Sequence, residues 1–185
     1  KAHLTEDSPF YSHLVRWNNC AANKTYFSDQ LQTDLSNYDC LEEMSSLLTQ
    51  DYFKADDMDR AQYLEMTTLL RGYLLASQGD RMSMAHSIEG RYPFLDHEFI
   101  DYANSLSKRF KLSGLNGKSI LRKSMKAFLP QEICARPKVA YQAPEIRPFI
   151  KLDKTISPLL NQYVCREQID RVGLFSWELV ERLIK

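Results

Sequence analysis

The sequence predicts a mainly α-helical fold, and three observations support this prediction. Apolar residues recur at helical spacing in several segments, few segments alternate like a strand, and helix-capping residues flank the apolar runs. The 185 residues are 44% hydrophobic, which excludes a disordered chain. No apolar run approaches the roughly 18 residues that a membrane-spanning helix needs. The length suggests about one domain, so we expect residues 1–185 to form a single unit.

The first predicted helix begins at Ser8 and Pro9. Serine is a frequent helix cap, and proline is favoured at the first helical position. Phe10, Leu14 and Trp17 follow at helical spacing.

The strongest helical pattern covers residues 55–77. Its apolar residues recur at intervals of three and four and form one stripe, which comprises Met66, Leu69, Leu70, Tyr73 and Leu74. Gly72 lies within this helix and costs about 1 kcal/mol relative to alanine, so we expect a close packing contact there. Gly79 is predicted to end the helix.

The second half of the chain is predicted to contain shorter helices. Asp96 is expected to cap a helix whose Phe99, Ile100 and Ala103 face inward. Gly114 and Gly117 indicate a turn before a helix over 118–129, whose inward residues are Leu121, Met125 and Phe128. Four prolines then interrupt regular structure: Pro130, Pro137, Pro144 and Pro148. Two or three short helices close the chain, the last capped by Ser176 with Glu178 in its first turn.

The net charge is zero, but the charges are unevenly distributed. Between Tyr102 and Gln131 the chain carries no acid and seven bases: Lys108, Arg109, Lys111, Lys118, Arg122, Lys123 and Lys126. Such a segment forms either a basic wall that attracts phosphate or nucleic acid, or a solvated helix face. We interpret it as mainly surface.

The four cysteines, Cys20, Cys40, Cys134 and Cys165, are too widely spaced for a zinc framework. They are expected to be reduced, semi-buried thiols, which favours an intracellular protein.

The segment 80–97 contains the most unusual pattern. His86 and Glu89 are three residues apart, but a zinc motif would need a second histidine where Gly90 stands, so no metal site is predicted. Glu89 lies beside Arg91 where a helix gives way to an extended segment, and we expect its carboxylate to be partly desolvated. Spacing alone leaves two roles open, a structural pair with Arg91 or a positioned acid or base.

Lys138 lies between Pro137 and Pro144. No acidic residue occurs between Glu132 and Glu145. Lys138 is either an exposed loop lysine or a cation that a proline-stiffened loop holds over a reacting phosphate.

Several ordered motifs resemble the glutamine-hydrolysing asparagine synthetase family. They are GYLLASQGDR (72–81), DRMSMAHSIEGRYPFLDH (80–97), KLSGLNGKSILRKSM (111–125), LPQEI (129–133) and RPKVAYQAP (136–144). Similar blocks occur in this order in the C-terminal part of that family's synthetase domain. The resemblance is specific from about Tyr63 to Phe149 and weak on either side.

This resemblance implies the helical C-terminal half of an α/β pyrophosphatase-loop synthetase domain, of the adenine nucleotide alpha hydrolase type. The family's N-terminal glutaminase domain and its SGG-x-DS loop, which binds MgATP, are absent from the sequence. We therefore expect a fragment that is inactive alone, with ATP and Mg²⁺ bound mainly by the missing upstream segment.

The family converts aspartate to aspartyl-AMP, which ammonia from glutamine then attacks. By position, Glu89 matches the glutamate that takes the proton of ammonia, and Lys138 matches the lysine that neutralises phosphate charge. Ser87 and Ile88 would lie near the nucleotide, and Asp80 near its phosphates. The expected partners are these substrates, with aspartate or a related carboxylate as acceptor, and the missing segments of the same protein. A homodimer is possible, nucleic acid and membrane are not expected, and the cytoplasm is the expected location.

A rival hypothesis is a non-catalytic helical module that binds nucleic acid or a protein through residues 108–126. The basic segment lacks interleaved aromatic residues beyond Phe110 and Phe128, which disfavours stacking on single strands.

Overall fold

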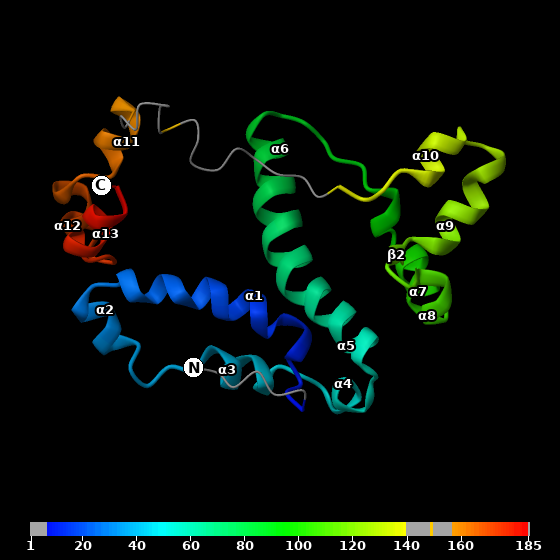
Figure 1. Ribbon diagram of the computed structural model, residues 1–185, viewed down its shortest axis with the longest axis horizontal. Coiled ribbons are helices and arrows are strands. Elements are labelled where there is room, and N and C mark those ends of the chain that lie inside the picture. The colour runs from blue at the N-terminus through cyan, green and yellow to red at the C-terminus, as the bar shows by residue number, and fades with distance from the viewer. Residues whose placement is uncertain (1–6, 140–148, 150–156, 185) are drawn as a thin grey trace. The chain divides into compact units, whose positions relative to one another are not determined.

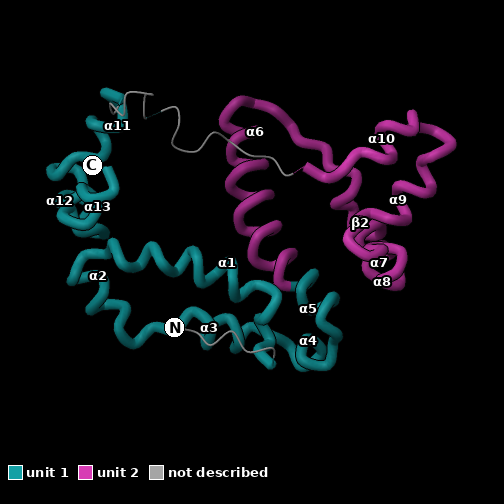
Figure 2. Tube along the Cα trace, in the orientation of Figure 1, with its two compact units in different colours: residues 1–63, 142–185 teal, residues 64–141 magenta. Residues whose placement is uncertain are grey.

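The computed structural model describes residues 7–139, 149 and 157–184 (Figure 1). Within these residues the fold is mainly helical and includes one small two-stranded sheet, which confirms the predicted class. No helix in this part of the chain is both long and apolar enough to cross a membrane. The chain divides into two compact units, residues 1–63 with 142–185 and residues 64–141 (Figure 2). That residues 1–185 belong to one family domain stays a prediction.

Unit 1 is made of short helices from both ends of the chain. In order they are α1 (Tyr11–Ala21), η1 (Ala22–Tyr26), α2 (Asp29–Asp34), α3 (Cys40–Ser46), α4 (Gln50–Lys54), α5 (Asp57–Leu64), whose last residue is assigned to unit 2, α11 (Pro158–Tyr163), α12 (Arg166–Val172) and α13 (Trp177–Ile184).

Unit 2 begins with a long helix and continues with shorter elements. They are η2 (Glu65–Asp80), α6 (Arg81–Ala85), η3 (Pro93–Leu95), α7 (His97–Ser105), α8 (Lys108–Lys111), β1 (Leu112–Ser113), β2 (Asn116–Gly117), α9 (Ser119–Ser124), η4 (Met125–Ala127) and α10 (Gln131–Ala135). The two strands form an antiparallel hairpin.

The helix predicted from the spacing of Phe10, Leu14 and Trp17 is confirmed, although Trp17 is only half-buried. Phe10 and Leu14 are only 3% and 2% exposed, and the rings of Phe10 and Trp17 lie 5.7 Å apart. The helix begins at Tyr11 rather than at Pro9. Ser8 caps the preceding turn instead, because its hydroxyl accepts a hydrogen bond from the Phe10 N–H at 3.2 Å.

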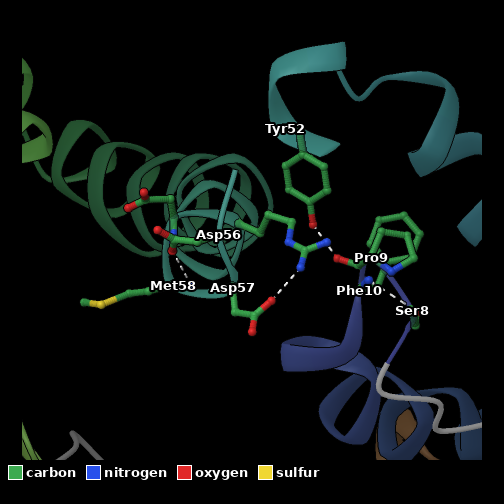
Figure 3. Close-up of polar contacts among 9 residues, drawn as sticks. Ser8, Pro9, Phe10, Tyr52, Asp56, Asp57 and Met58 are labelled. Carbon is green, nitrogen blue, oxygen red and sulfur yellow. Dashed lines mark hydrogen bonds and ion pairs between the residues drawn. The ribbon is translucent and has the colours of Figure 1, made fainter. Parts of the chain in front are cut away.

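A buried tyrosine ties α4 to the start of α1. Tyr52 is 4% exposed, and its hydroxyl donates a hydrogen bond of 2.5 Å to the Pro9 carbonyl (Figure 3). Burial raises the pKa of the Tyr52 phenol above its usual value. In the same region the Asp56 carboxylate caps α5 by accepting hydrogen bonds from the N–H groups of Met58 and Asp59. The Tyr52–Pro9 hydrogen bond thus connects segments 43 residues apart in the sequence.

The C-terminal helices are anchored to the segment that follows η1. Phe27 and Phe175 form an antiparallel bridge with their rings 5.8 Å apart. The Ser28 hydroxyl donates to the Gly173 carbonyl at 2.7 Å, and the Ser176 N–H donates to the Tyr26 carbonyl at 2.9 Å. Both ends of the chain therefore contribute to unit 1.

The last helix, α13, begins directly after Ser176, as predicted. Glu178 in its first turn accepts a hydrogen bond from Arg166 at 2.9 Å and one from the Ser176 hydroxyl at 3.3 Å. A hydrogen bond from a backbone N–H, together with these two partners, lowers the pKa of the Glu178 carboxyl.

The long helix of unit 2 differs from the prediction. Residues Glu65–Asp80 form a π-helix, which α6 continues, so the helix ends at Ala85 and not at Gly79. A π-helix bonds each N–H to the carbonyl five residues back, so residues at intervals of three and four do not line up on one face. Of the predicted apolar stripe, Tyr73 and Leu74 are exposed, whereas Met66, Leu69 and Leu70 are half-buried. The space around Gly72 is open, so the close contact expected there is wrong.

The shorter elements confirm some local predictions and correct others. Asp96 caps α7 by accepting from the Phe99 N–H at 3.0 Å, but the Phe99 ring is exposed. The helix expected over 118–129 comprises only α9 and the turn η4, and Phe128, expected inside, is 78% exposed. Of the cysteines, Cys134 is buried and Cys165 half-buried, whereas Cys20 and Cys40 are exposed, contrary to the prediction.

Candidate functional site

Unit 2 contains a cavity of about 1120 Å³, which we call the basic cavity. Its apolar lining comes mainly from the hairpin, α9 and α10, and includes Leu112, Leu115, Leu121, Met125, Leu129 and Ile133. Its charged lining is cationic only and consists of Lys118, Arg122, Arg136 and Lys138. No aspartate or glutamate lines the cavity among the residues that the structure describes. The cavity therefore suits an anionic ligand.

The hairpin places Lys118 at the edge of this cavity. Gly114 has φ +58° and opens the two-residue turn between β1 and β2, a position that favours glycine. Lys118 then also adopts a left-handed conformation, with φ +59°, immediately before α9. A non-glycine residue in this region is strained by about 1–2 kcal/mol. Backbone strain of this kind is often found at functional sites.

Arg122 holds two walls of the cavity together. Its Nε donates to the Gly117 carbonyl at 3.2 Å, and its Nη1 donates to the Cys134 carbonyl at 2.7 Å. The first bond attaches α9 to the end of the hairpin, and the second attaches α9 to α10. Arg122 thus adds positive charge to the cavity and also fixes its shape.

Lys138 lies on an exposed part of the same cavity, directly after Pro137. No described acid forms an ion pair with it, in keeping with the acid-free sequence around it. The interpretation of the basic segment 102–131 as mainly surface is confirmed, since Lys118 is exposed and Arg122 is half-buried, although both also line the cavity. It fits Arg109, which lies 5.0 Å from the centre of the Phe110 ring.

The second group of predicted residues lies at the end of α6. The Ile88 N–H donates to the Ser83 carbonyl at 2.8 Å, and the Ser87 N–H donates to the Met84 carbonyl at 3.1 Å. These two bonds define a Schellman motif, whose left-handed position is usually glycine. Here Ser87 occupies that position, with φ +57°. The helix end therefore stores strain at Ser87, for which the family resemblance implies a place near the nucleotide.

Glu89 follows this turn and is not desolvated as expected. Its side chain is 74% exposed, and its Oε1 lies 2.8 Å from Nη2 of Arg91, which is also exposed. The pair with Arg91, one of the two alternatives left open by the sequence, is present, but the expected partial burial of Glu89 is wrong. An exposed ion pair contributes only about 0–1 kcal/mol to stability. The pair with Arg91 therefore adds little to stability.

Of the predicted site residues, only Lys138 lines the basic cavity. Lys138 shares the basic cavity with Lys118, Arg122 and Arg136, none of which was selected from the sequence as a site residue. Glu89 does not line this cavity, and neither do Asp80, Ser87 or Ile88. The sequence signal for Lys118 and Arg122 was the acid-free stretch between Tyr102 and Gln131. It indicated that this stretch is positively charged but not that these side chains line a cavity.

The charged lining of the basic cavity fits the phosphates of a nucleotide, because fixed cations stabilise phosphate oxygens. It does not fit a divalent metal, which binds oxygen ligands such as carboxylates. No group of three or more His, Cys, Asp or Glu side chains arranged for a metal occurs within residues 7–139, 149 and 157–184.

The mainly helical fold is that of the helical part of a synthase domain. The chain matches the family model of asparagine synthase over residues 4–185, and it belongs to that family.

Three curated relatives illustrate this relationship. The chain is 30% identical to the amidase chry2 of Gibberella zeae over 128 residues, covering 65% of the chain and 18% of the relative. It is 32% identical to asparagine synthetase [glutamine-hydrolyzing] 1 of Bacillus subtilis over 108 residues, covering 56% and 17%. It is 36% identical to the asparagine synthetase of Cricetulus griseus over 107 residues, covering 54% and 19%. The chain thus spans under a fifth of each relative. No solved structure gave a significant match.

Proposed function

We propose that the complete protein carrying this chain is an ATP-dependent amide-forming ligase of the asparagine synthetase type. The observation that carries the proposal is the basic cavity, with four cationic side chains and no acidic one among its described lining residues. Family membership supports the same reaction class. In this proposal the chain supplies phosphate-binding cations and a proton acceptor.

In the first step, a carboxylate oxygen of the acceptor attacks the α-phosphorus of ATP. An oxygen–phosphorus bond forms, the bond to the leaving oxygen breaks, and pyrophosphate departs. Negative charge accumulates on the phosphate oxygens during this step, where fixed cations lower the barrier most. Lys138 neutralises charge at the α-phosphate, and the other cations of the basic cavity bind the phosphates beyond it.

In the second step, ammonia attacks the acyl carbon of the adenylate. The nitrogen becomes cationic as the carbon–nitrogen bond forms, and Glu89 accepts one of its protons while AMP leaves. An exposed carboxylate can take this role, because a substrate can reach it. Ser87 and Ile88 contact the nucleotide and Asp80 lies near its phosphates. We assign no residue of this chain to Mg²⁺.

The acceptor is aspartate or a related carboxylate. Relatives of this chain carry the printed names amidase and asparagine synthetase, so membership of the family does not select one acceptor. Ammonia is supplied by a glutaminase segment of the same protein, and the reaction takes place in the cytoplasm. A homodimer fits this proposal but is not required by it.

The decisive test of the phosphate role is Lys138→Ala in the complete protein. Loss of a charged donor at the transition state costs about 3–4 kcal/mol, so carboxylate-dependent pyrophosphate release should fall by about 150-fold to 1000-fold. Lys138→Arg should restore little, because a planar guanidinium does not replace a compact ammonium group. Lys123→Ala is the matched control, an exposed base that does not line the cavity. Near-normal release from Lys138→Ala would refute the assignment.

The role of Glu89 is tested separately with Glu89→Gln. This change keeps the shape and removes the charge, so amide formation should fall by about tenfold to a thousandfold, the size of a general-base effect. Pyrophosphate release and glutamine hydrolysis should continue. If amide formation per folded molecule is unchanged, Glu89 is only the partner of Arg91.

The rival function makes a different prediction. A module that binds nucleic acid through residues 108–126 would bind a labelled oligonucleotide with strong salt dependence, and the complete protein would release no pyrophosphate. These two results together would refute the ligase proposal and support the nucleic-acid-binding module.

A further inference from the structure

Lys118 occupies a position where the local rules of backbone structure favour other residues. Its φ of +59° and ψ of +35° are left-handed, a conformation that favours glycine and asparagine. It is also the N-cap of α9, where asparagine, aspartate, serine, threonine and glycine are preferred. A lysine side chain has no acceptor atom, and here it makes no capping hydrogen bond. Asparagine would satisfy both rules, and lysine satisfies neither.

The backbone of Lys118 is held from both sides. Gly117 pairs with Leu112 in the hairpin, and its carbonyl accepts the hydrogen bond from Nε of Arg122 at 3.2 Å. The Lys118 carbonyl accepts the N–H of Arg122 at 3.0 Å, as the first carbonyl of a helix does. A left-handed residue other than glycine persists where its surroundings fix it in this way. The hairpin and α9 together therefore impose the strained conformation.

The charge of Lys118 adds to this local cost. Its ammonium group shares the basic cavity with Arg122, Arg136 and Lys138, and no described acid lines that cavity. None of the ion pairs among the described residues includes Lys118. Like charges repel each other, and a bound anion would remove the repulsion. A residue that is unfavourable as backbone, cap and charge is typical of a functional position.

The cations of the basic cavity are not equivalent. Arg122 donates Nε and Nη1 to two backbone carbonyls, so part of its donor capacity is used within the fold. Arg136 and Lys138 follow α10, whereas Lys118 lies between the hairpin and α9. A chain of phosphates in the cavity can therefore be bound from two separate elements, with Lys138 on one and Lys118 on the other.

We propose that Lys118 binds the β- and γ-phosphates of the nucleotide, the part that departs as pyrophosphate, while Lys138 serves the α-phosphate. The roles of the two lysines rest on the proposed function, but the binding of a polyphosphate anion by Lys118 does not. Lys118 forms no covalent bond. Its ammonium group neutralises the negative charge that pyrophosphate gains as the bond to the α-phosphorus breaks. The need for this charge explains a lysine at a position that suits asparagine.

The test is a calorimetric titration of the complete protein with pyrophosphate, ATP and AMP. Lys118→Asn suits the backbone but removes the charge, so the affinity for pyrophosphate and ATP should fall by about tenfold, the effect of one charge-assisted hydrogen bond. The affinity for AMP, which lacks the β- and γ-phosphates, should not change. Lys118→Arg retains the charge and should keep most of the pyrophosphate affinity. Lys123→Asn is the matched control, because Lys123 is an exposed base of α9 that does not line the cavity.

Melting temperatures of the same variants, measured without ligand, test the backbone argument. Lys118→Asn should raise the melting temperature, and Lys118→Arg should not, because arginine meets the same backbone and capping costs. If Lys118→Asn fails to raise it, the argument from strain is wrong.

The binding results decide the role of the lysine. If Lys118→Asn leaves the pyrophosphate affinity unchanged, or if the unmodified protein binds no pyrophosphate, Lys118 is not a phosphate-binding residue. If the affinity for AMP falls as much as that for ATP, the assignment to the β- and γ-phosphates is wrong. If the unmodified protein releases no pyrophosphate from ATP with any carboxylate, the proposed function fails, and the titration with pyrophosphate still decides whether Lys118 binds this anion.

Discussion

Arg122 offers a direct test of how the basic cavity is held together. Its two hydrogen bonds connect α9 with the hairpin and with α10. Hydrogen bonds from a charged donor contribute about 1.5–3 kcal/mol each, and partial solvent exposure favours the lower value. Removing both with Arg122→Met should therefore cost about 3 kcal/mol of local stability. Arg122→Lys can retain one bond and should cost about half as much.

The assay is amide hydrogen exchange over residues 112–136 in the complete protein. Each 1.4 kcal/mol corresponds to a tenfold change in an equilibrium constant, so exchange should accelerate about a hundredfold in Arg122→Met and about tenfold in Arg122→Lys. Lys123→Met changes the neighbouring exposed base, which does not line the cavity, and should leave exchange unchanged. An acceleration below about threefold in Arg122→Met would show that these bonds do not hold the walls together.

Three further outcomes are expected. Tyr52→Phe leaves the Pro9 carbonyl without its partner and should lower the free energy of unfolding, measured with urea, by about 1–3 kcal/mol; a loss below about 0.5 kcal/mol would contradict this reading. The lowered pKa of Glu178 predicts a stabilisation that is present above pH 4.5, the ordinary value for this group, and that is lost as the pH falls through the lowered folded-state value. The difference in free energy of unfolding between the original protein and Glu178→Gln should therefore shrink as the pH is lowered. A difference that stays constant with pH would contradict the stabilising role of the Glu178 carboxylate. The 185-residue chain alone should show no ATP:pyrophosphate exchange, because it lacks the SGG-x-DS loop; robust exchange would show that the nucleotide site is misplaced.

Local signals in the sequence were the most reliable guide to this fold. Asp96 was identified as the cap of α7, and it does accept the Phe99 N–H. The last helix also begins after Ser176, as its capping pattern indicates. Such features depend on hydrogen bonds between residues two to four positions apart, which a sequence displays directly. The buried face of α1 is likewise local, because one helical period determines it.

Features that depend on residues distant in the sequence, or on which backbone hydrogen-bonding pattern a helix adopts, were not predicted. The π-helix η2 carries an apolar pattern that fits an α-helix, and nothing in Glu65–Asp80 distinguishes bonds to the fifth residue from bonds to the fourth. The basic cavity gathers Lys118 and Arg136, which lie 18 positions apart in the sequence, through the arrangement of the hairpin, α9 and α10. The exposure of Glu89 depends on what surrounds it in three dimensions. Its neighbours in the sequence, one apolar and one glycine, suggested the opposite.

The left-handed serine at the end of α6 bears on how this protein would respond to directed evolution. At the C′ position of a Schellman motif, glycine avoids the steric penalty that Ser87 accepts. A selection for heat resistance alone should therefore enrich Ser87→Gly. Under the proposed function the serine contacts the nucleotide, so a selection for product formation should retain it. The two selections would therefore favour different residues at position 87, glycine for stability and serine for activity. Such trade-offs between stability and activity are common where a strained residue takes part in a functional site.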